Sequence, residues 1–168
     1  MTIDFATTYR DHLEYVWHSL RRLAVPAADL EDVAHEVFLV VHRKLADYDP
    51  SRPLRPWLFG IAFRVASEYR RRAARRAELG HTGLESSTSE PSPETLAARQ
   101  QAVRLAQRAL AAVDDDARAV FILAELDGVA VTEVATTLEI PVNTAYTRLR
   151  RARLAVANAI TGGPHDRA

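Results

Sequence analysis

The sequence predicts an all-α protein made of two small helical domains. Apolar residues recur at spacings of three and four along most of the 168 residues, and no run alternates apolar and polar positions as a strand would. A polar, Ser/Thr-rich stretch separates the two helical parts. Because such stretches are typical of flexible connections, we expect domains over residues 1–78 and 92–162, a flexible acidic linker over 79–91 and a tail over 163–168.

Three helices are expected in the first domain. The first covers roughly residues 5–24 and ends before Pro26. The second follows Asp29, which we assign as the N-cap, with Asp32 at the capping-box position. Its apolar positions have the clearest helical spacing in the chain: Leu30, Val33, Ala34, Val37, Phe38, Val41 and Leu45. Three prolines then predict a loop over 48–56, followed by a helix from Trp57 into an arginine-rich segment.

The second domain begins with the helix signal Ser92-Pro93-Glu94, which places serine at the N-cap and proline at the first helical position. The apolar face of that helix is expected to contain Val103, Ala106, Leu110 and Val113. Three aspartates, residues 114–116, favour the positive end of a further helix, for which Gly128 is the expected C-cap. A short helix over 132–138 and a longer one over 142–160 complete the chain.

Composition excludes several classes of protein. The chain has no cysteine, which rules out disulfides, thiolate metal sites and a cysteine nucleophile. His35 and His42 lie two helical turns apart, about 10 Å, which is too far to share one metal ion. We see no nucleophile–base pair and expect no enzyme, metal or cofactor. No signal peptide or long apolar run is visible, so a cytoplasmic protein without membrane insertion is expected.

Charge is balanced overall but unevenly distributed. The chain has 22 basic and 22 acidic residues, giving a formal net charge of zero. One basic cluster contains Arg64, Arg70, Arg71, Arg72, Arg75 and Arg76, with Glu68 as the acid within it. A second contains Arg148, Arg150, Arg151 and Arg153. Two separate basic clusters in a neutral chain indicate two sites for a polyanion.

The last two expected helices have the pattern of a helix-turn-helix. The connection Glu139-Ile140-Pro141 is short, and proline prevents the first helix from continuing. One face of the second helix contains Ala145, Leu149, Ala152, Val156 and Ile160. The opposite face centres on Thr144, Thr147 and Arg151 and is flanked by Asn143, Arg148 and Arg150. These side chains suit base edges and phosphates, which favours major-groove binding over an ordinary helical hairpin with a solvated basic face.

Several short segments occur in an order and spacing typical of one family. They are DLEDVAHEVF (29–38), PWLFGIA (56–62) before the arginine cluster, AVFIL (119–123), LDG (126–128), EVA (133–135), IPVNT (140–144) and RLRRAR (148–153). Together they resemble the extracytoplasmic-function group of bacterial RNA polymerase sigma factors. The resemblance covers nearly all of the chain except the expected linker and the tail after Gly162.

The resemblance implies a region 2-like bundle and a region 4-like helix-turn-helix domain, which bind core RNA polymerase and direct promoter-specific initiation. Docking on core polymerase would involve Asp29, Asp32, His35, Glu36 and Phe38. Recognition and melting of the −10 element would involve Arg52, Arg55, Trp57, Arg64, Arg71, Arg72 and Arg75. The −35 element would be read by Asn143, Thr144, Thr147, Arg148, Arg150 and Arg151. It also implies regulation by a separate anti-sigma protein.

Some positions depart from the usual family pattern. They are His35 in place of glutamine, Phe63 in place of a basic residue, Val113-Asp114 in place of Leu-Pro, Ala130 in place of a capping Ser or Thr, and Ala145-Tyr146 in place of a Val-Lys pair. The main alternative is a stand-alone helix-turn-helix repressor, and a helical enzyme domain is a further one. Two dissimilar halves, each with its own basic cluster, favour the sigma factor.

Overall fold

The chain is helical in every regular element of residues 4–80 and 95–162, which are the residues that the computed structural model describes. It divides into two compact units, Met1–Ser87 and Thr88–Ala168. The predicted all-α class is therefore confirmed. Most of the expected linker, the helix signal Ser92-Pro93-Glu94 and the tail over 163–168 lie outside the described residues.

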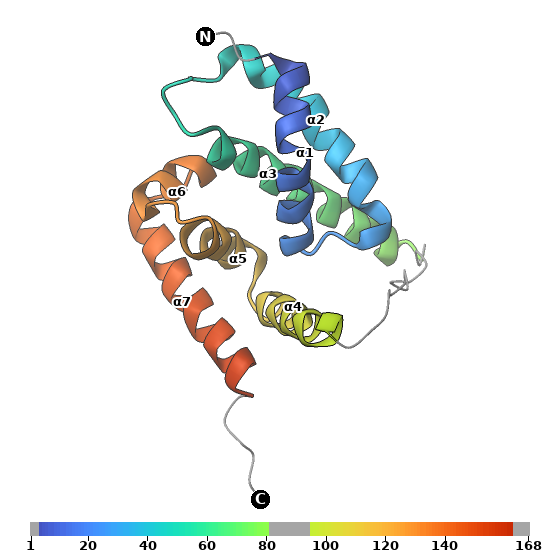
Figure 1. The fold of residues 1–168 in the computed structure, drawn as a ribbon, viewed down its shortest axis with the longest axis vertical. Coiled ribbons are helices and arrows are strands. Elements are labelled where there is room, and N and C mark those ends of the chain that lie inside the picture. Colours follow the sequence, from blue (N-terminus) through green and yellow to red (C-terminus); the bar gives the residue numbers. More distant parts are fainter. Residues whose placement is uncertain (1–3, 81–94, 163–168) are drawn as a thin grey trace, which may run out of the picture. The chain divides into compact units, whose positions relative to one another are not determined.

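The first unit is a bundle of three helices, α1 (Phe5–Arg22), α2 (Leu30–Lys44) and α3 (Leu54–Glu78), each in contact with the other two (Figure 1). Short 3₁₀ turns, η1 (Ala27–Asp29) and η2 (Leu45–Asp47), lie at the two ends of α2. Large apolar side chains fill the core, and those of α2 among them follow the predicted spacing: Val16, Leu20, Leu23, Leu30, Val37, Val41, Leu58 and Phe59. Burying each removes apolar surface from water, which is the main stabilisation of such a bundle.

Two local predictions in this unit are wrong. The loop ends before Leu54 rather than at Pro56, because a proline in the first turn of a helix lacks only an N–H that would have no helical partner. Asp29 precedes α2 as expected, but its side chain does not cap the helix. Its backbone is already helical (φ −105°, ψ −3°) because η1 runs directly into α2, whereas a capping side chain needs an extended backbone. The carboxylate instead accepts a 2.6 Å hydrogen bond from the Tyr69 hydroxyl.

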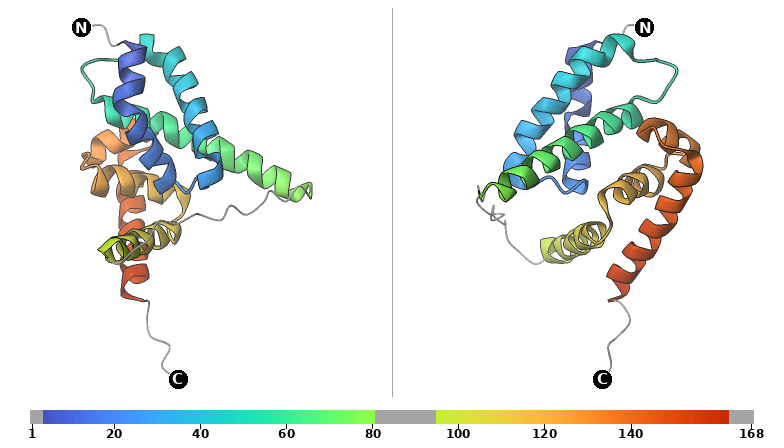
Figure 2. Two further views of the ribbon diagram at one scale, coloured as in Figure 1. Left: turned by 45° about the vertical axis from the view of Figure 1, so that its right-hand side comes forward. Right: turned by 180° about the vertical axis from the view of Figure 1, so that it is seen from behind.

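The second unit contains α4 (Thr95–Ala111), α5 (Asp115–Phe121) with a π-helical continuation η3 (Ile122–Leu126), α6 (Val131–Leu138) and α7 (Val142–Thr161). Helix α7 contacts α4, α5 and α6 (Figure 2). The buried positions include many small residues: Ala109, Ala117, Ala119, Ala135, Ala145 and Ala152. Small side chains let these short helices pack closely around Val120, Ile122, Leu123 and Leu149.

Local signals set the helix boundaries of the second unit. The Asp114 side chain accepts a 3.0 Å hydrogen bond from the backbone N–H of Ala117, which confirms the predicted start of α5. Gly128 follows η3 with φ +69°, directly after the C-cap residue Asp127. Ala130 occupies the N-cap of α6 without a side-chain hydrogen bond. Between α6 and α7, Glu139 adopts the left-handed conformation (φ 57°) and allows the tight turn of the helix-turn-helix.

Some apolar positions expected in the core of the second unit lie at its surface. Val103 of α4 is 46% exposed and Ile160 near the end of α7 is 53% exposed, whereas Ala145, Leu149 and Ala152 are buried. The apolar spacing identifies one face of each helix, but a residue on that face is buried only where another element packs against that part of the helix. No helix in the described residues is long and apolar enough to cross a membrane.

Candidate docking groove and nucleic-acid interfaces

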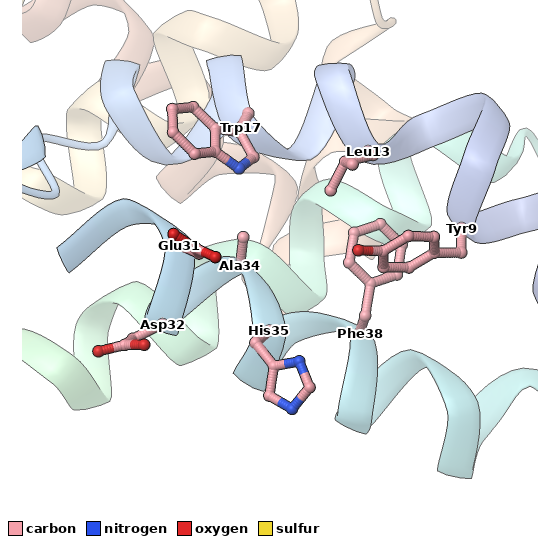
Figure 3. Close-up of a pocket in the computed structure, with 8 residues that line it drawn as sticks. All are labelled: Tyr9, Leu13, Trp17, Glu31, Asp32, Ala34, His35 and Phe38. Carbon is pink, nitrogen blue, oxygen red and sulfur yellow. The ribbon is translucent and has the colours of Figure 1, made fainter.

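A groove of about 310 Å³ lies between α1 and α2 of the first unit (Figure 3). Its lining residues are Tyr9, Leu13 and Trp17 from α1 and Glu31, Asp32, Ala34, His35 and Phe38 from α2. The Tyr9 ring packs edge-on against Phe38 with ring centroids 4.6 Å apart, and Trp17 is 37% exposed. An aromatic floor with carboxylates at its edge suits an amphipathic helix that carries basic residues.

Three of the predicted docking residues, Asp32, His35 and Phe38, line this groove. Asp29 and Glu36 do not. The Glu36 carboxylate instead lies 2.7 Å from the Arg72 guanidinium of α3, with its side chain 44% exposed. One helical turn after Asp32, the 40° offset of the helix brings position 36 round toward α3.

Sequence reasoning missed the α1 side of the groove. Leu13 and Trp17 have the apolar spacing of the first expected helix, which does not show whether such side chains are buried or line a groove, and Tyr9 is not part of that spacing. The signal that could have indicated the groove is the large size of these side chains on α1, a helix that packs against two others and cannot bury all of them. Asp29, meanwhile, contributes to the packing of α3 on α2. Burial, together with the hydrogen bond to Asp29, raises the pKa of Tyr69 to about 12.

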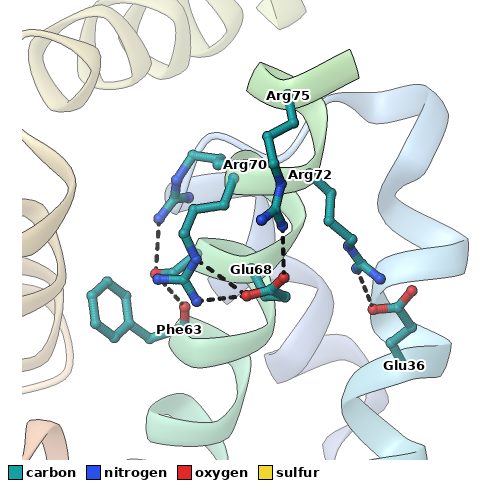
Figure 4. A network of polar contacts seen from close by, with 8 residues as sticks. Glu36, Phe63, Glu68, Arg70, Arg72 and Arg75 are labelled. Atoms are coloured by element: carbon teal, nitrogen blue, oxygen red, sulfur yellow. Dashed lines mark hydrogen bonds and ion pairs between the residues drawn. The ribbon is translucent and has the colours of Figure 1, made fainter.

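The arginines of α3 form ion pairs with two carboxylates (Figure 4). The guanidinium of Arg71 lies 2.6 Å from Glu68, and that of Arg75 lies 3.4 Å from the same carboxylate. Hydrogen bonding to Arg71 holds the pKa of Glu68 below its usual value, and hydrogen bonding to Glu36 raises the pKa of Arg72. These carboxylates relieve part of the repulsion among the arginines and still leave the surface positive.

Arg70, which belongs to the same cluster, has a structural contact instead. It donates a 2.8 Å hydrogen bond to the backbone oxygen of Leu23 at the end of α1, and a 3.2 Å bond to the Ser67 hydroxyl. A guanidinium at the carboxyl end of a helix satisfies carbonyl groups that have no helical partner.

The loop before α3 is held by local contacts. The ring of Tyr48 packs against Trp57 with centroids 4.9 Å apart, and its hydroxyl donates to the backbone oxygen of Arg52. Asp49 accepts a 2.9 Å hydrogen bond from the N–H of Ser51. Residues 52, 55 and 57, predicted from sequence, therefore lie on one organised loop and the start of the following helix.

Arg55, in the first turn of α3, extends over α1. Its guanidinium lies 5.4 Å from the centre of the Tyr15 ring, a cation–π contact. Burial, followed by the positive charge of Arg55, lowers the pKa of the neighbouring His12. The imidazole therefore adds no positive charge here near neutral pH, and the positive charge at this end of the unit comes from Arg52 and Arg55.

The outer face of α7 carries the predicted residues in two groups. Asn143, Thr147 and Arg150 are exposed, and Arg150 makes no ion pair or hydrogen bond within residues 4–80 and 95–162. Arg148 and Arg151 instead turn toward α5. Their guanidinium groups lie 2.7 Å from Asp116 and 2.6 Å from Asp114.

The helical wheel did not predict this second group. It places the Cβ of Arg151 near the middle of the outer face, but the long side chain turns back to reach a carboxylate of the neighbouring helix. Thr144, also placed at the centre of that face, is half-buried. Tyr146, not among the predicted residues, is a large exposed side chain on the same helix. Within the described part of the chain, no group of three or more His, Cys, Asp or Glu residues could hold a metal ion.

Comparisons with known proteins match both units. Residues 8–76 match the family Sigma-70 region 2, and residues 104–156 match Sigma-70, region 4. The chain is 32% identical over 142 residues to RNA polymerase sigma factor CnrH of Cupriavidus metallidurans, covering 79% of this chain and 74% of that protein. It is 28% identical over 145 residues to the ECF RNA polymerase sigma-E factor of Escherichia coli K12, covering 81% and 76%.

Two solved structures share the fold. One is CnrH in complex with the cytosolic domain of CnrY, with a TM-score of 0.67, 24% identity, and coverage of 95% of this chain and 89% of that one. The other is the sigma factor RpoE in complex with the anti-sigma factor NepR from Bartonella quintana, with a TM-score of 0.70, 20% identity, and coverage of 98% and 99%.

Proposed function

Because the chain belongs to the extracytoplasmic-function group of sigma-70 factors, we propose that the three surfaces described above divide its contacts with polymerase and promoter. As a sigma factor, the chain binds core RNA polymerase and directs promoter-specific transcription initiation. Its relatives are sigma factors, which are not enzymes, and polymerase would supply the chemistry. A stand-alone repressor is not favoured, because both units match sigma regions.

The groove between α1 and α2 is the proposed docking site for core polymerase. The observation that carries this proposal is the combination of exposed aromatic side chains with an acidic edge in one groove. A polymerase helix would place apolar residues against Tyr9 and Trp17, above the buried Phe38, and basic residues beside Glu31 and Asp32. Apolar anchors with a complementary charged rim are typical of helix-in-groove recognition.

Charge reversal at the rim tests the docking site. Glu31→Arg combined with Asp32→Arg should weaken binding of core polymerase roughly tenfold or more, because like charges would then face each other across the interface. Glu36→Gln is the matched control, since that carboxylate faces α3 on the same helix. Binding is measured by titrating labelled full-length protein with core polymerase, and circular dichroism checks folding. Wild-type affinity in the double variant would exclude this groove as the docking site.

The loop before α3 and the arginines of α3 are the proposed −10 interface. Arg52, Arg55 and Trp57 would contact an extruded base, and Arg64, Arg71, Arg72 and Arg75 would contact nearby phosphates. The support is that Tyr48 and Asp49 hold the loop in place before DNA binds. Extruding a base costs a few kcal/mol of stacking, so a preformed loop lowers the total cost of melting.

The outer face of α7 is the proposed −35 interface, through Asn143, Thr144, Thr147, Arg148, Arg150 and Arg151. The test is Arg151→Ala and Arg150→Ala in reconstituted holoenzyme on a promoter library with varied −35 sequences. A base-reading arginine should cost roughly 1–3 kcal/mol at one base pair. A phosphate-binding arginine should weaken all sequences alike and reduce the salt slope by about one unit. Unchanged selectivity and affinity in both variants would contradict the proposed interface.

We also propose that a separate anti-sigma protein binds this chain in the cytoplasm, where polymerase and promoter DNA are. The solved neighbours are complexes of CnrH with the CnrY cytosolic domain and of RpoE with the anti-sigma factor NepR. Capture of a partner that displaces the chain from core polymerase would support this. Tight promoter binding by the factor alone, without polymerase, would instead support the repressor.

A further inference from the structure

Three consecutive aspartates at the start of α5 each bind a different arginine. Asp114 lies 2.6 Å from Arg151, and Asp116 lies 2.7 Å from Arg148, both on α7. Asp115 lies 3.1 Å from Arg118 of its own helix. Two of the three aspartates therefore contact arginines of the helix that carries the proposed −35 interface.

Hydrogen bonds hold the backbone around the three aspartates in place. Asp114 uses one carboxylate oxygen to cap α5 at the N–H of Ala117 and the other to bind Arg151. The partner of Asp115, Arg118, is 6% exposed and donates to the backbone oxygens of Leu110 at 2.8 Å and Val113 at 2.7 Å. This buried guanidinium fixes the turn between α4 and α5 from which the aspartates extend.

We propose that Asp114 and Asp116 are positioning residues for −35 recognition, which hold the guanidinium groups of Arg151 and Arg148 and weaken their attraction to phosphates. This inference rests on the proposed −35 interface. A guanidinium has five N–H donors in a rigid plane, so a carboxylate at one edge fixes the plane and leaves donors for DNA. The side chain of Arg151 is 60% exposed and remains accessible.

The consequence is specificity. A mobile arginine binds any phosphate, and that contact carries no sequence information. An arginine that is already paired with a carboxylate gains less from a phosphate, and its fixed plane favours a bidentate partner such as guanine. Neutralising the aspartates should therefore strengthen binding to altered −35 sequences more than binding to the preferred one.

The test uses Asp114→Asn and Asp116→Asn in reconstituted holoenzyme. Asparagine is as good an N-cap as aspartate, so Asp114→Asn removes the ion pair and keeps the start of α5. The matched control is Glu125→Gln, which frees Arg153, an arginine of α7 that pairs with η3 instead of α5. Urea unfolding of each variant checks that the unit remains folded.

We expect the preference for the best −35 sequence over altered ones to fall about two- to fivefold in each Asp→Asn variant, the range set by exposed ion pairs. The salt dependence of binding should become steeper, and Asp116→Glu should retain wild-type selectivity. Glu125→Gln should change neither quantity. Wild-type selectivity in both Asp→Asn variants, or an equal change in Glu125→Gln, would overturn the inference.

Arg151→Ala separates this inference from the proposed interface. If Arg151→Ala changes −35 selection and Asp114→Asn does not, the positioning role of Asp114 is wrong and the interface stands. If Arg151→Ala has no effect on selection, the interface at this residue is wrong and the positioning role of Asp114 falls with it. In the double variant, Asp114→Asn should add nothing to Arg151→Ala, because the aspartate acts through that arginine. A further loss of selectivity in the double variant would contradict the mechanism.

Discussion

The arginine-rich helices α3 and α7 place their ion pairs differently. On α3, Arg71 and Arg75 both bind Glu68 of the same helix, and Arg72 reaches α2 through Glu36. Pairs within one helix adjust its local charge without holding it against a neighbour. We infer that most of the α3 arginine surface can be altered with little effect on the packing of the first unit.

On α7, the pairs cross to a neighbouring helical segment, α5 and its continuation η3. Arg151 and Arg148 bind the start of α5, and Arg153 binds Glu125 of η3. Arg148 and Arg151 therefore contribute both to the proposed DNA surface and to the packing of α7 against α5. A substitution that removes one of these arginine charges from α7 is therefore expected also to change how α7 is held in the second unit.

The cores of the two units also differ, in the size of the side chains that they bury. The first unit buries large side chains such as Leu20, Leu58 and Phe59, whereas many buried positions of the second unit are alanines. Burial of a large apolar side chain stabilises a fold by about 1.5–3 kcal/mol, and alanine contributes much less. The second unit should therefore depend more on its buried polar contacts.

The largest expected effect is the loss of one of these contacts. Arg118→Ala should destabilise the second unit by about 3 kcal/mol, because the buried carbonyl groups of Leu110 and Val113 lose their donor. Arg70→Ala in the first unit removes a similar but half-buried contact to Leu23 and should cost about 1 kcal/mol. Equal losses would contradict the contrast between the units.

Urea unfolding can measure the two effects separately. Both tryptophans, Trp17 and Trp57, belong to the first unit, so their fluorescence reports that unit. Far-ultraviolet circular dichroism reports the helices of both. Arg118→Ala should lower the midpoint by circular dichroism and leave the fluorescence midpoint nearly unchanged, while Arg70→Ala should lower the fluorescence midpoint.

The next effect concerns the hydrogen bond from Tyr69 to Asp29. Tyr69→Phe should destabilise the first unit by about 1.5 kcal/mol, because the acceptor is a carboxylate. The pKa of Tyr69 is raised to about 12, above the value of about 10 for an unfolded tyrosine. The stabilisation is therefore fully present below pH 10 and is lost as the pH rises from 10 toward 12, since the unfolded chain releases the phenolic proton first.

Fluorescence-monitored urea unfolding at pH 8 and pH 11 measures this linkage. The wild type should lose more stability between these two pH values than Tyr69→Phe does. Parallel losses in the two proteins would show that the hydroxyl does not hold its proton through this contact.

Local signals made most of the fold predictable from the sequence. The spacing of the apolar residues of α2 predicted that helix, and Asp114 marked the start of α5 correctly. Contacts between residues distant in sequence were not predictable in this way. Asp29 looked like a cap because capping is a local pattern, and its contact with Tyr69 spans 40 residues.

The candidate docking groove was also predictable only in part, because local sequence signals do not show which helices pack together. The motifs identified Asp32 and Phe38, but not the groove side formed by Tyr9 and Trp17, because periodicity shows which face is apolar and not how fully it is covered. Arginine is usually found at the surface, and only the fold shows that Arg118 is buried. The roles of the individual docking and DNA-contacting residues stay predictions.

A smaller effect concerns the missing cap of α6. Ala130→Ser should stabilise the second unit by about 1 kcal/mol, because the hydroxyl would accept a hydrogen bond from a backbone N–H in the first turn that alanine cannot bind. The circular dichroism midpoint should rise, while the tryptophan fluorescence midpoint stays unchanged. A midpoint that does not rise would mean that water already satisfies these N–H groups equally well.

The smallest effect tests the opening contrast between α3 and α7 directly. Arg148→Ala combined with Arg151→Ala removes two pairs that join α7 to α5, each worth about 0.5 kcal/mol at the surface, so the second unit should lose about 1 kcal/mol. Arg71→Ala combined with Arg75→Ala removes pairs within α3, and the first unit should lose less, because no helix is released from a neighbour. Both double variants are compared by urea unfolding at low and at 1 M salt. Screening should reduce the difference between wild type and the α7 variant, since these pairs lie near the surface. A larger loss on α3 than on α7 would show that α3 depends on its own charge pattern more than α7 depends on α5.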